Sequence, residues 1–205
     1  TERELFSMED AANEFRLERI NASPVKFSTD KLVWFNGMYI RALDPEDLAL
    51  RCLPFLQKAG LLPDPCPDEQ IKYLVSIIPL VQERLRLLSD APGQLDIFLM
   101  DDIPVPEKNI LIPKKMDAQS SLDILSAVKE SLEQCMDFSV RGIEESLRKT
   151  AGELNLSDGQ LFMPVRAASS GRSVTPGIFE SLCALGKERS IRRISTACDV
   201  LRVQD

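Results

Sequence analysis

Two arginines lie in a stretch of the sequence that contains no acidic residue. Residues 159–179 read GQLFMPVRAASSGRSVTPGIF, with Arg166 and Arg172 but neither Asp nor Glu, although the whole chain has 32 acidic and 25 basic residues. A guanidinium is a planar set of N–H donors that pairs with acceptors such as phosphate oxygens and base edges. The stretch is therefore a candidate binding surface, and the remaining sequence has to indicate its ligand.

The sequence lacks the residues that most catalytic and metal sites need. It contains no histidine, and hence no imidazole base for a serine or cysteine nucleophile and no HExxH zinc motif. Neither common glycine-rich phosphate loop is present. The cysteines are odd in number and include no CxxC pair, which favours buried free thiols over a zinc site; they are Cys52, Cys66, Cys135, Cys183 and Cys198. We expect no catalytic residue and no metal site in this chain.

Charge is unevenly distributed along the chain. The net charge is −7, yet residues 139–205 contain ten Lys or Arg against eight Asp or Glu, which leaves 15 basic and 24 acidic residues in 1–138. Phosphate affinity depends on the local field within a Debye length, so a basic end on an acidic protein is compatible with nucleic-acid contact. An excess of two charges also lies within chance variation, so charge alone leaves the ligand open.

Composition indicates a folded, soluble chain. With 205 residues, 44% hydrophobic and 28% charged, it can bury one large core or two small ones. No run of eighteen apolar residues occurs, and the charged start TERELFSMED has no apolar segment like that of a signal peptide. These features predict a cytoplasmic protein without membrane contact.

Apolar spacing of three and four residues dominates, and this predicts an all-α fold without a significant sheet. In the first half we expect helices over 7–18, 29–41, 45–59 and 94–100, the third starting with Asp44 as N-cap and Pro45 at its first position. Pro54 and Pro79 should kink or break their helices, so that 68–90 forms two segments meeting near Pro79. An irregular, proline-marked connection covers 101–117, and three or four further helices are expected over 122–136, 140–154, 175–186 and 188–201.

Two blocks of the sequence resemble one protein family. The first block carries the pattern Phe15, Leu17, Ser23-Pro24, Phe27, Lys31-Leu32, Trp34, Asn36-Gly37 and Tyr39-Ile40-Arg41. It resembles the region after the catalytic domain in bacterial glutamyl-tRNA synthetases, class I ligases that attach glutamate to tRNA. The second block, FMPVRAASSGRSVTPGIFESLCALGKERSIRRI over 162–194, resembles the PLR, TPGLF and GKE elements of that family in the same order. The HIGH-like and KMSKS-like signatures of the family are absent.

The resemblance implies that this chain is the C-terminal half of a glutamate tRNA ligase. It assigns 1–43 to the end of the helical stem-contact region, 44–115 to a first anticodon-binding helical subdomain and 116–205 to a second. The implied partners are the tRNA for glutamate and the protein's own N-terminal catalytic domain, in a monomer. This half would need no cofactor, because ATP and magnesium belong to the missing N-terminal half. A helical protein-interaction module derived from the same fold is the alternative.

The resemblance also implies which residues read the anticodon. Arg166 matches an arginine that contacts anticodon bases, and Thr175, Pro176 and Ile178 match positions that line the same pocket. The arginine for the third base aligns with Arg84, or with Arg86 if the register slips by two; it would favour cytosine over guanine, because a guanidinium donates to acceptors and rejects donors. From local rules alone, Thr175 and Pro176 also suit an N-cap and first helical position, and Arg84 suits a solvated helix face.

Other basic and aromatic residues have two readings each. Phosphate contact is possible for four arginines, for which helix-dipole complementation and solubility are the alternatives: Arg172, Arg189, Arg192 and Arg193. Trp34, Phe35 and Tyr39 fit a core face better than a stacking platform, with Trp34 partly exposed. Asn36-Gly37 permits a close approach of either another chain segment or RNA.

Overall fold

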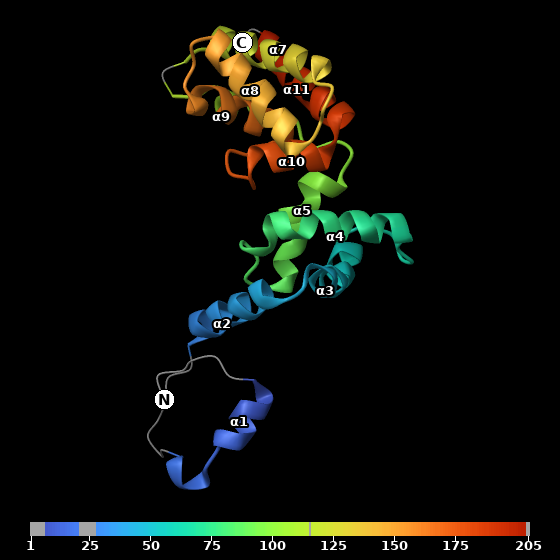
Figure 1. Cartoon of the computed structure of the whole chain (residues 1–205), viewed down its shortest axis with the longest axis vertical. Coiled ribbons are helices and arrows are strands. Elements are labelled where there is room, and N and C mark those ends of the chain that lie inside the picture. Colours follow the sequence, from blue (N-terminus) through green and yellow to red (C-terminus); the bar gives the residue numbers. More distant parts are fainter. Residues whose placement is uncertain (1–6, 21–27, 115, 204–205) are drawn as a thin grey trace.

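The computed structural model describes residues 7–20, 28–114 and 116–203. In these ranges the chain forms eleven α-helices and two short 3₁₀ helices, with no strand. The all-α prediction is confirmed. Figure 1 shows an elongated molecule with α1 at one end. Helices α3, α4 and α5 form a first unit in the middle, and α7 to α11 form a second unit at the other end.

The first two helices begin where the sequence predicts. Helix α1 spans Met8–Glu14 with Ser7 as its N-cap, but it stops before Glu18 because Phe15 is extended; a 3₁₀ turn, Leu17–Arg19, follows. Helix α2 spans Thr29–Ala42. The predicted loop between them falls largely on 21–27, outside the described residues.

The exposed side of α2 differs from the prediction. The buried residues of α2 are Gly37 and Ile40, whereas Trp34 is 47% exposed and Tyr39 is 50% exposed. The predicted core position is therefore wrong for Tyr39, whereas the partial exposure predicted for Trp34 is confirmed. The reason is that α2 packs through Gly37, which has no side chain and lets the backbone at 85–86 approach closely; Trp34 and Tyr39 on other sides of the helix then face solvent.

The first unit consists of α3 (Pro45–Lys58), α4 (Asp68–Gln82), the 3₁₀ turn Leu88–Asp90 and α5 (Ala91–Leu99). As predicted, the Asp44 side chain caps α3 by accepting a hydrogen bond from Glu46 N at 2.9 Å. The core of the unit contains Leu48, Cys52, Leu56, Leu74, Ile77, Ile78, Val81, Leu95 and Phe98.

Helix α4 continues through Pro79, so the predicted break there is wrong. Pro79 lies inside α4, and Pro54 lies inside α3 in the same way. Both prolines are exposed, so water can reach the carbonyl that loses its helical partner. The buried side chains of Ile77, Ile78 and Val81 hold the backbone of α4 in place on either side of Pro79.

The second unit consists of α7 (Ala118–Gln134), α8 (Val140–Glu153), α9 (Asp158–Ser170), α10 (Ile178–Leu185) and α11 (Lys187–Arg202). Helix α9 was not predicted, because Pro164 and the following run of small residues obscure its pattern. It begins with a capping box made by Ser157 and Gln160 and ends at Gly171 in the left-handed conformation, φ 70°.

The two hydrophobic clusters define how the units connect. The second cluster includes Leu111 of α6 (Lys108–Leu111) together with Leu125, Val128, Leu147, Val165 and Ile194. The first cluster ends at Leu99 along the chain but also takes in Leu185 of α10. The connection between the units therefore lies in 100–107, earlier than the boundary expected at residue 115, and α10 contacts both units.

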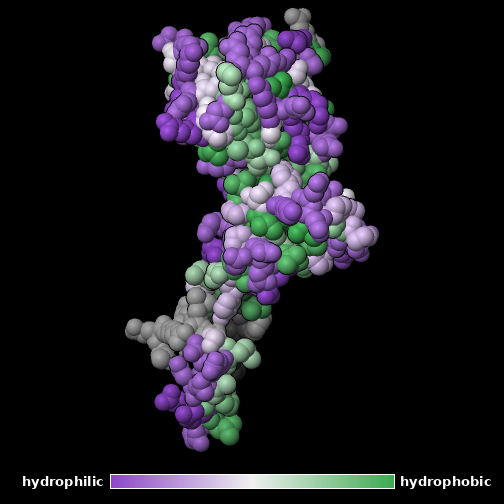
Figure 2. Space-filling view, turned by 45° about the vertical axis from the view of Figure 1, so that its right-hand side comes forward, coloured by the Kyte–Doolittle hydropathy of each residue, from purple (hydrophilic) through white to green (hydrophobic). Residues whose placement is uncertain are grey.

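Two further features concern the surface and the thiols. Figure 2 shows hydrophilic side chains over much of the visible face of the second unit, with hydrophobic side chains around the junction of the units. In the described ranges no helix has the length and apolar character that crossing a bilayer requires.

All five cysteines are free thiols as predicted, but only Cys52 and Cys198 are fully buried. Burial raises the pKa of Cys52 to about 11.

Candidate nucleic-acid interface

The carbonyl oxygen of Thr175 accepts hydrogen bonds from two arginines, one from each helical unit. Arg84 follows the C-terminal end of α4, and its Nη2 donates to Thr175 O at 2.7 Å. Arg166 lies on α9, and its Nη1 donates to the same oxygen at 3.0 Å. The structure thus brings together three of the residues that the sequence singled out, although Arg84 lies 91 positions from Thr175 along the chain.

The two guanidinium groups meet without a carboxylate partner. In the part of the chain that the structure describes, neither Arg84 nor Arg166 forms an ion pair with an acidic side chain. Burial, and secondly the positive charge of Arg84, lower the pKa of Arg166. Two cations held close together by neutral oxygens favour an anionic or acceptor-rich ligand, since such a ligand relieves their mutual repulsion.

The residues around Arg166 form its support. Its Nη1 is also within hydrogen-bonding distance of Thr175 Oγ1, at 2.5 Å, and of Pro176 O, at 2.7 Å. Thr175 is 6% exposed and Ile178 is 5% exposed, and Pro176 is buried too. These three predicted contact residues therefore lie beneath the surface, where they hold Arg166 and the start of α10.

The predicted capping role of Thr175 is wrong. The N-cap of α10 is Gly177, and the helix starts at Ile178. A Cβ atom at Gly177 would meet the flexible carboxylate of Glu180 in the first turn of the helix. The Thr175 hydroxyl instead accepts a hydrogen bond from Arg166 and donates to Pro176 O at 3.1 Å.

Arg172 ties the loop between α9 and α10 to the first unit. Its Nη2 forms an ion pair with Asp96 of α5, and its Nη1 donates to Gly93 O at 2.7 Å. Its side chain is 40% exposed. The charge of Arg172 is therefore partly neutralised within the protein, and its clearest contribution is to fix the loop that carries Thr175.

Three arginines of α11 cap the C-terminal end of α5 in the other unit. Arg189 donates to Phe98 O at 2.6 Å, and Arg192 donates to Asp101 O at 3.0 Å. Arg193 donates to Ile97 O, Ser169 O and Met100 O at 2.8, 2.9 and 2.7 Å. The last carbonyls of a helix lack intrahelical partners and carry partial negative charge, so these guanidiniums satisfy them.

These contacts change the interpretation of the α11 arginines. Arg193 is 4% exposed, so the predicted phosphate contact fails for it: the guanidinium is buried between the units and lies on carbonyl groups. The predicted dipole complementation holds, but the helix concerned is α5 rather than α11 itself. Because these bonds cross the junction, they fix the relative position of the units and hence the distance between Arg84 and Arg166.

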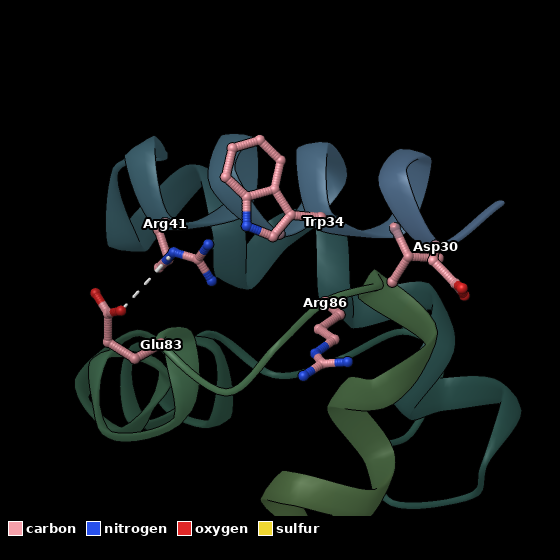
Figure 3. Close-up of a pocket in the computed structure, with 7 residues that line it drawn as sticks. Asp30, Trp34, Arg41, Glu83 and Arg86 are labelled. Carbon is pink, nitrogen blue, oxygen red and sulfur yellow. Dashed lines mark ion pairs between the residues drawn. The ribbon is translucent and has the colours of Figure 1, made fainter. Parts of the chain in front are cut away.

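Arg86, the alternative to Arg84 in the alignment, lines a pocket to which Thr175 does not contribute. Figure 3 shows it in a pocket between α2 and the end of α4, with Trp34, Asp30 and the ion pair of Arg41 and Glu83; the two charged groups of that pair are 3.8 Å apart. The cavity volume is about 470 Å³. The structure thus separates the two candidates, because Arg84 alone joins Arg166.

Contacts in the same pocket show which segment approaches Asn36-Gly37 closely. Asn36 Nδ2 donates to Arg86 O at 2.5 Å. A Cβ atom on Gly37 would lie 3.6 Å from both Arg86 Cα and Leu85 O. The segment that approaches closely here is therefore the protein's own chain at 85–86.

The fold and the paired arginines define an all-α binding domain made of two helical units. A family model described as "Anticodon binding domain" matches residues 47–198. The chain therefore belongs to the anticodon binding domain family.

Similar proteins narrow the comparison. The chain is 41% identical over 200 residues to a glutamate–tRNA ligase of Chloroflexus aurantiacus, covering 97% of this chain and 40% of that protein. It is 39% identical over 198 residues to one of Roseiflexus castenholzii, covering 97% and 39%. A crystal structure of a glutamate tRNA ligase from Elizabethkingia meningosepticum has the same fold, with a TM-score of 0.78 and 24% identity over 98% of this chain and 38% of that one.

The chain spans about 40% of the length of the curated relatives it matches, and the matched portion is their C-terminal part. The family resemblance inferred from the sequence is confirmed.

Proposed function

We propose that this chain binds the anticodon loop of the tRNA for glutamate, as the C-terminal part of a glutamate tRNA ligase. The observation that carries the proposal is the convergence of Arg84 and Arg166 on Thr175 O, where neither guanidinium has an acidic partner among the described residues. An anticodon loop offers unstacked base edges and phosphates, which are acceptor-rich and repel carboxylates. The acid-free stretch 159–179 fits this ligand.

Arg84 suits the reading of the third anticodon base. Its bond to Thr175 O uses one N–H group of Nη2, and the side chain is otherwise exposed. The remaining N–H groups can donate to the acceptors N3 and O2 on the Watson–Crick edge of an unpaired cytosine, whereas the same edge of guanine presents N1–H and an amino group, which would oppose another donor. Arg166, which lies deeper, suits contacts to the first two bases.

The other expectations concern the protein to which this part belongs. In the proposed ligase, ATP, glutamate and magnesium bind to an N-terminal catalytic domain, and the whole enzyme acts as a cytoplasmic monomer. This chain by itself would supply recognition only. With ATP, glutamate and tRNA it should yield no charged tRNA unless the catalytic domain is added.

Binding of tRNA at several salt concentrations tests the proposal. The chain should bind fluorescently labelled glutamate tRNA, and the logarithm of the affinity should fall linearly with the logarithm of salt concentration, because phosphate contacts release counterions. A tRNA with an unrelated anticodon should bind more weakly at every salt concentration. Failure to bind glutamate tRNA at low salt would contradict the proposal and favour the alternative, a helical protein-interaction module.

A further inference from the structure

Arg166 and Arg84 differ in the number of hydrogen-bond acceptors that hold each guanidinium. Arg166 Nη1 has three acceptors, namely Thr175 O, Thr175 Oγ1 and Pro176 O. The guanidinium of Arg84 has Thr175 O as its acceptor within the described residues. Arg84 is also exposed, whereas Thr175 is buried. The orientation of Arg84 therefore depends on Thr175 more than that of Arg166 does.

The position of Thr175 depends in turn on Arg166. Residues 171–177 connect α9 to α10 and belong to neither helix. The hydroxyl of Thr175 is held between Arg166 and Pro176 O. A chain of contacts thus leads from Arg166 in the second unit, through the Thr175 hydroxyl and carbonyl, to Arg84 in the first unit.

We infer that Thr175 is a positioning residue for Arg84, so that discrimination at the third anticodon base depends on a hydroxyl group that is itself buried. The inference rests on the proposed function. An arginine side chain has many rotamers, and a base contact distinguishes cytosine from guanine only if the guanidinium is held in one orientation before the RNA arrives. Thr175 O supplies that restraint from the opposite unit.

Thr175→Val tests the inference because valine keeps the shape of threonine and removes the hydroxyl. Two anticodon stem-loop RNAs that differ in the third base, CUC and CUG, are titrated against the chain by fluorescence anisotropy. A good arginine contact to a base edge corresponds to a preference of about 5- to 150-fold. Thr175→Val should reduce this preference towards that of Arg84→Gln, and Thr175→Ser, which keeps the hydroxyl, should retain most of it.

Two comparisons separate positioning from general damage. If Thr175 acts through Arg84, the double variant Arg84→Gln with Thr175→Val should show the same CUC to CUG ratio as Arg84→Gln alone. Arg166→Lys, which keeps the charge but loses the planar set of donors, should also lower the ratio. Arg141→Gln removes an arginine that is 88% exposed and paired with Glu145 on α8; it should leave the ratio unchanged.

The outcomes distinguish this inference from the proposed function. If Thr175→Val and Arg166→Lys weaken binding of both RNAs by one factor and leave the ratio intact, the inference is overturned while anticodon binding stands. If Thr175→Val does not fold, as judged by its circular dichroism melt, Arg166→Lys alone decides. If the unmodified chain binds neither RNA, the proposed function fails, and the inference fails with it.

Discussion

Replacement of Arg193 by methionine should loosen the junction between the two helical units. Arg193 is 4% exposed and donates to three carbonyl groups that belong to α5, to the residue after it and to the end of α9. Methionine fills a similar volume but leaves these carbonyls without their donor. The stretch around Ile97 and Met100 therefore loses its connection to α11.

The expected loss follows from the three hydrogen bonds and one opposing contribution. Each bond is worth about 1 kcal/mol net, and somewhat more because the donor is charged. Burial lowers the pKa of Arg193 to about 10, a sign that burying this guanidinium costs free energy, and methionine removes that cost. The free energy of unfolding should fall by about 2–4 kcal/mol, which for a chain of this size lowers Tm by roughly 5–15 °C.

Urea and thermal unfolding, followed by circular dichroism, measure this change. Arg192→Met is the matched control, because Arg192 lies on the same helix but is 52% exposed and contacts Asp102 at 3.5 Å; it should cost less than about 1 kcal/mol. Surface substitutions usually change the free energy of unfolding by less than about 0.5 kcal/mol. If the free energy of unfolding of Arg193→Met differs from that of the unmodified chain by no more than this, the arginine does not hold the units together.

Three further predictions concern other parts of the molecule. Arg84→Gln should narrow the preference for a CUC over a CUG anticodon without changing the salt slope of binding. Arg166→Ala should weaken binding to both RNAs and, because Arg166 holds Thr175, should narrow the preference as well. A shift of the preference caused by Arg86→Gln instead of Arg84→Gln would refute the assignment. Gly142→Ala should destabilise the chain by about 1–3 kcal/mol in urea, since a Cβ there overlaps Asp137 O, whereas Gly152→Ala, with open space at its Cβ, should not. Hydrogen bonds from Ser120 lower the pKa of Asp117, the N-cap of α7. The ionised carboxylate therefore stabilises the fold above its unfolded pKa of about 4, and this stabilisation is lost as the pH falls through the lower folded pKa. Asp117→Asn should remove this contribution to the pH dependence of the free energy of unfolding, measured by denaturation at about pH 2–5.

Local signals in the sequence determined the type of most elements and several of their starts. Ser7 and Asp44 cap α1 and α3 because a short polar side chain reaches the first free N–H groups of its own helix. The two blocks that resemble synthetases lie towards the two ends of the chain, and the family match, 47–198, begins just after the first block and includes the second. The fold class and the family were therefore readable from residues that are close together along the chain.

Several outcomes depended on contacts that no local pattern contains. The continuation of α4 through Pro79 is possible because that proline faces solvent, and the exposure of Tyr39 follows from the burial of Gly37. Helix α9 packs through small residues such as Ala167 and Ala168, which give a weak apolar pattern in the sequence.

The roles of the arginines were decided by tertiary structure alone. Arg84, Arg166 and Arg193 are chemically identical, and the sequence gives each a long, charged side chain that suits many partners. Packing of the two units places Arg193 on the carbonyls of α5 and leaves Arg84 exposed beside Arg166. Arg84 and Arg193 each have an acceptor more than ninety positions away in the chain, at Thr175 O and Ile97 O, so only the folded structure determines which guanidinium is buried and which stays exposed.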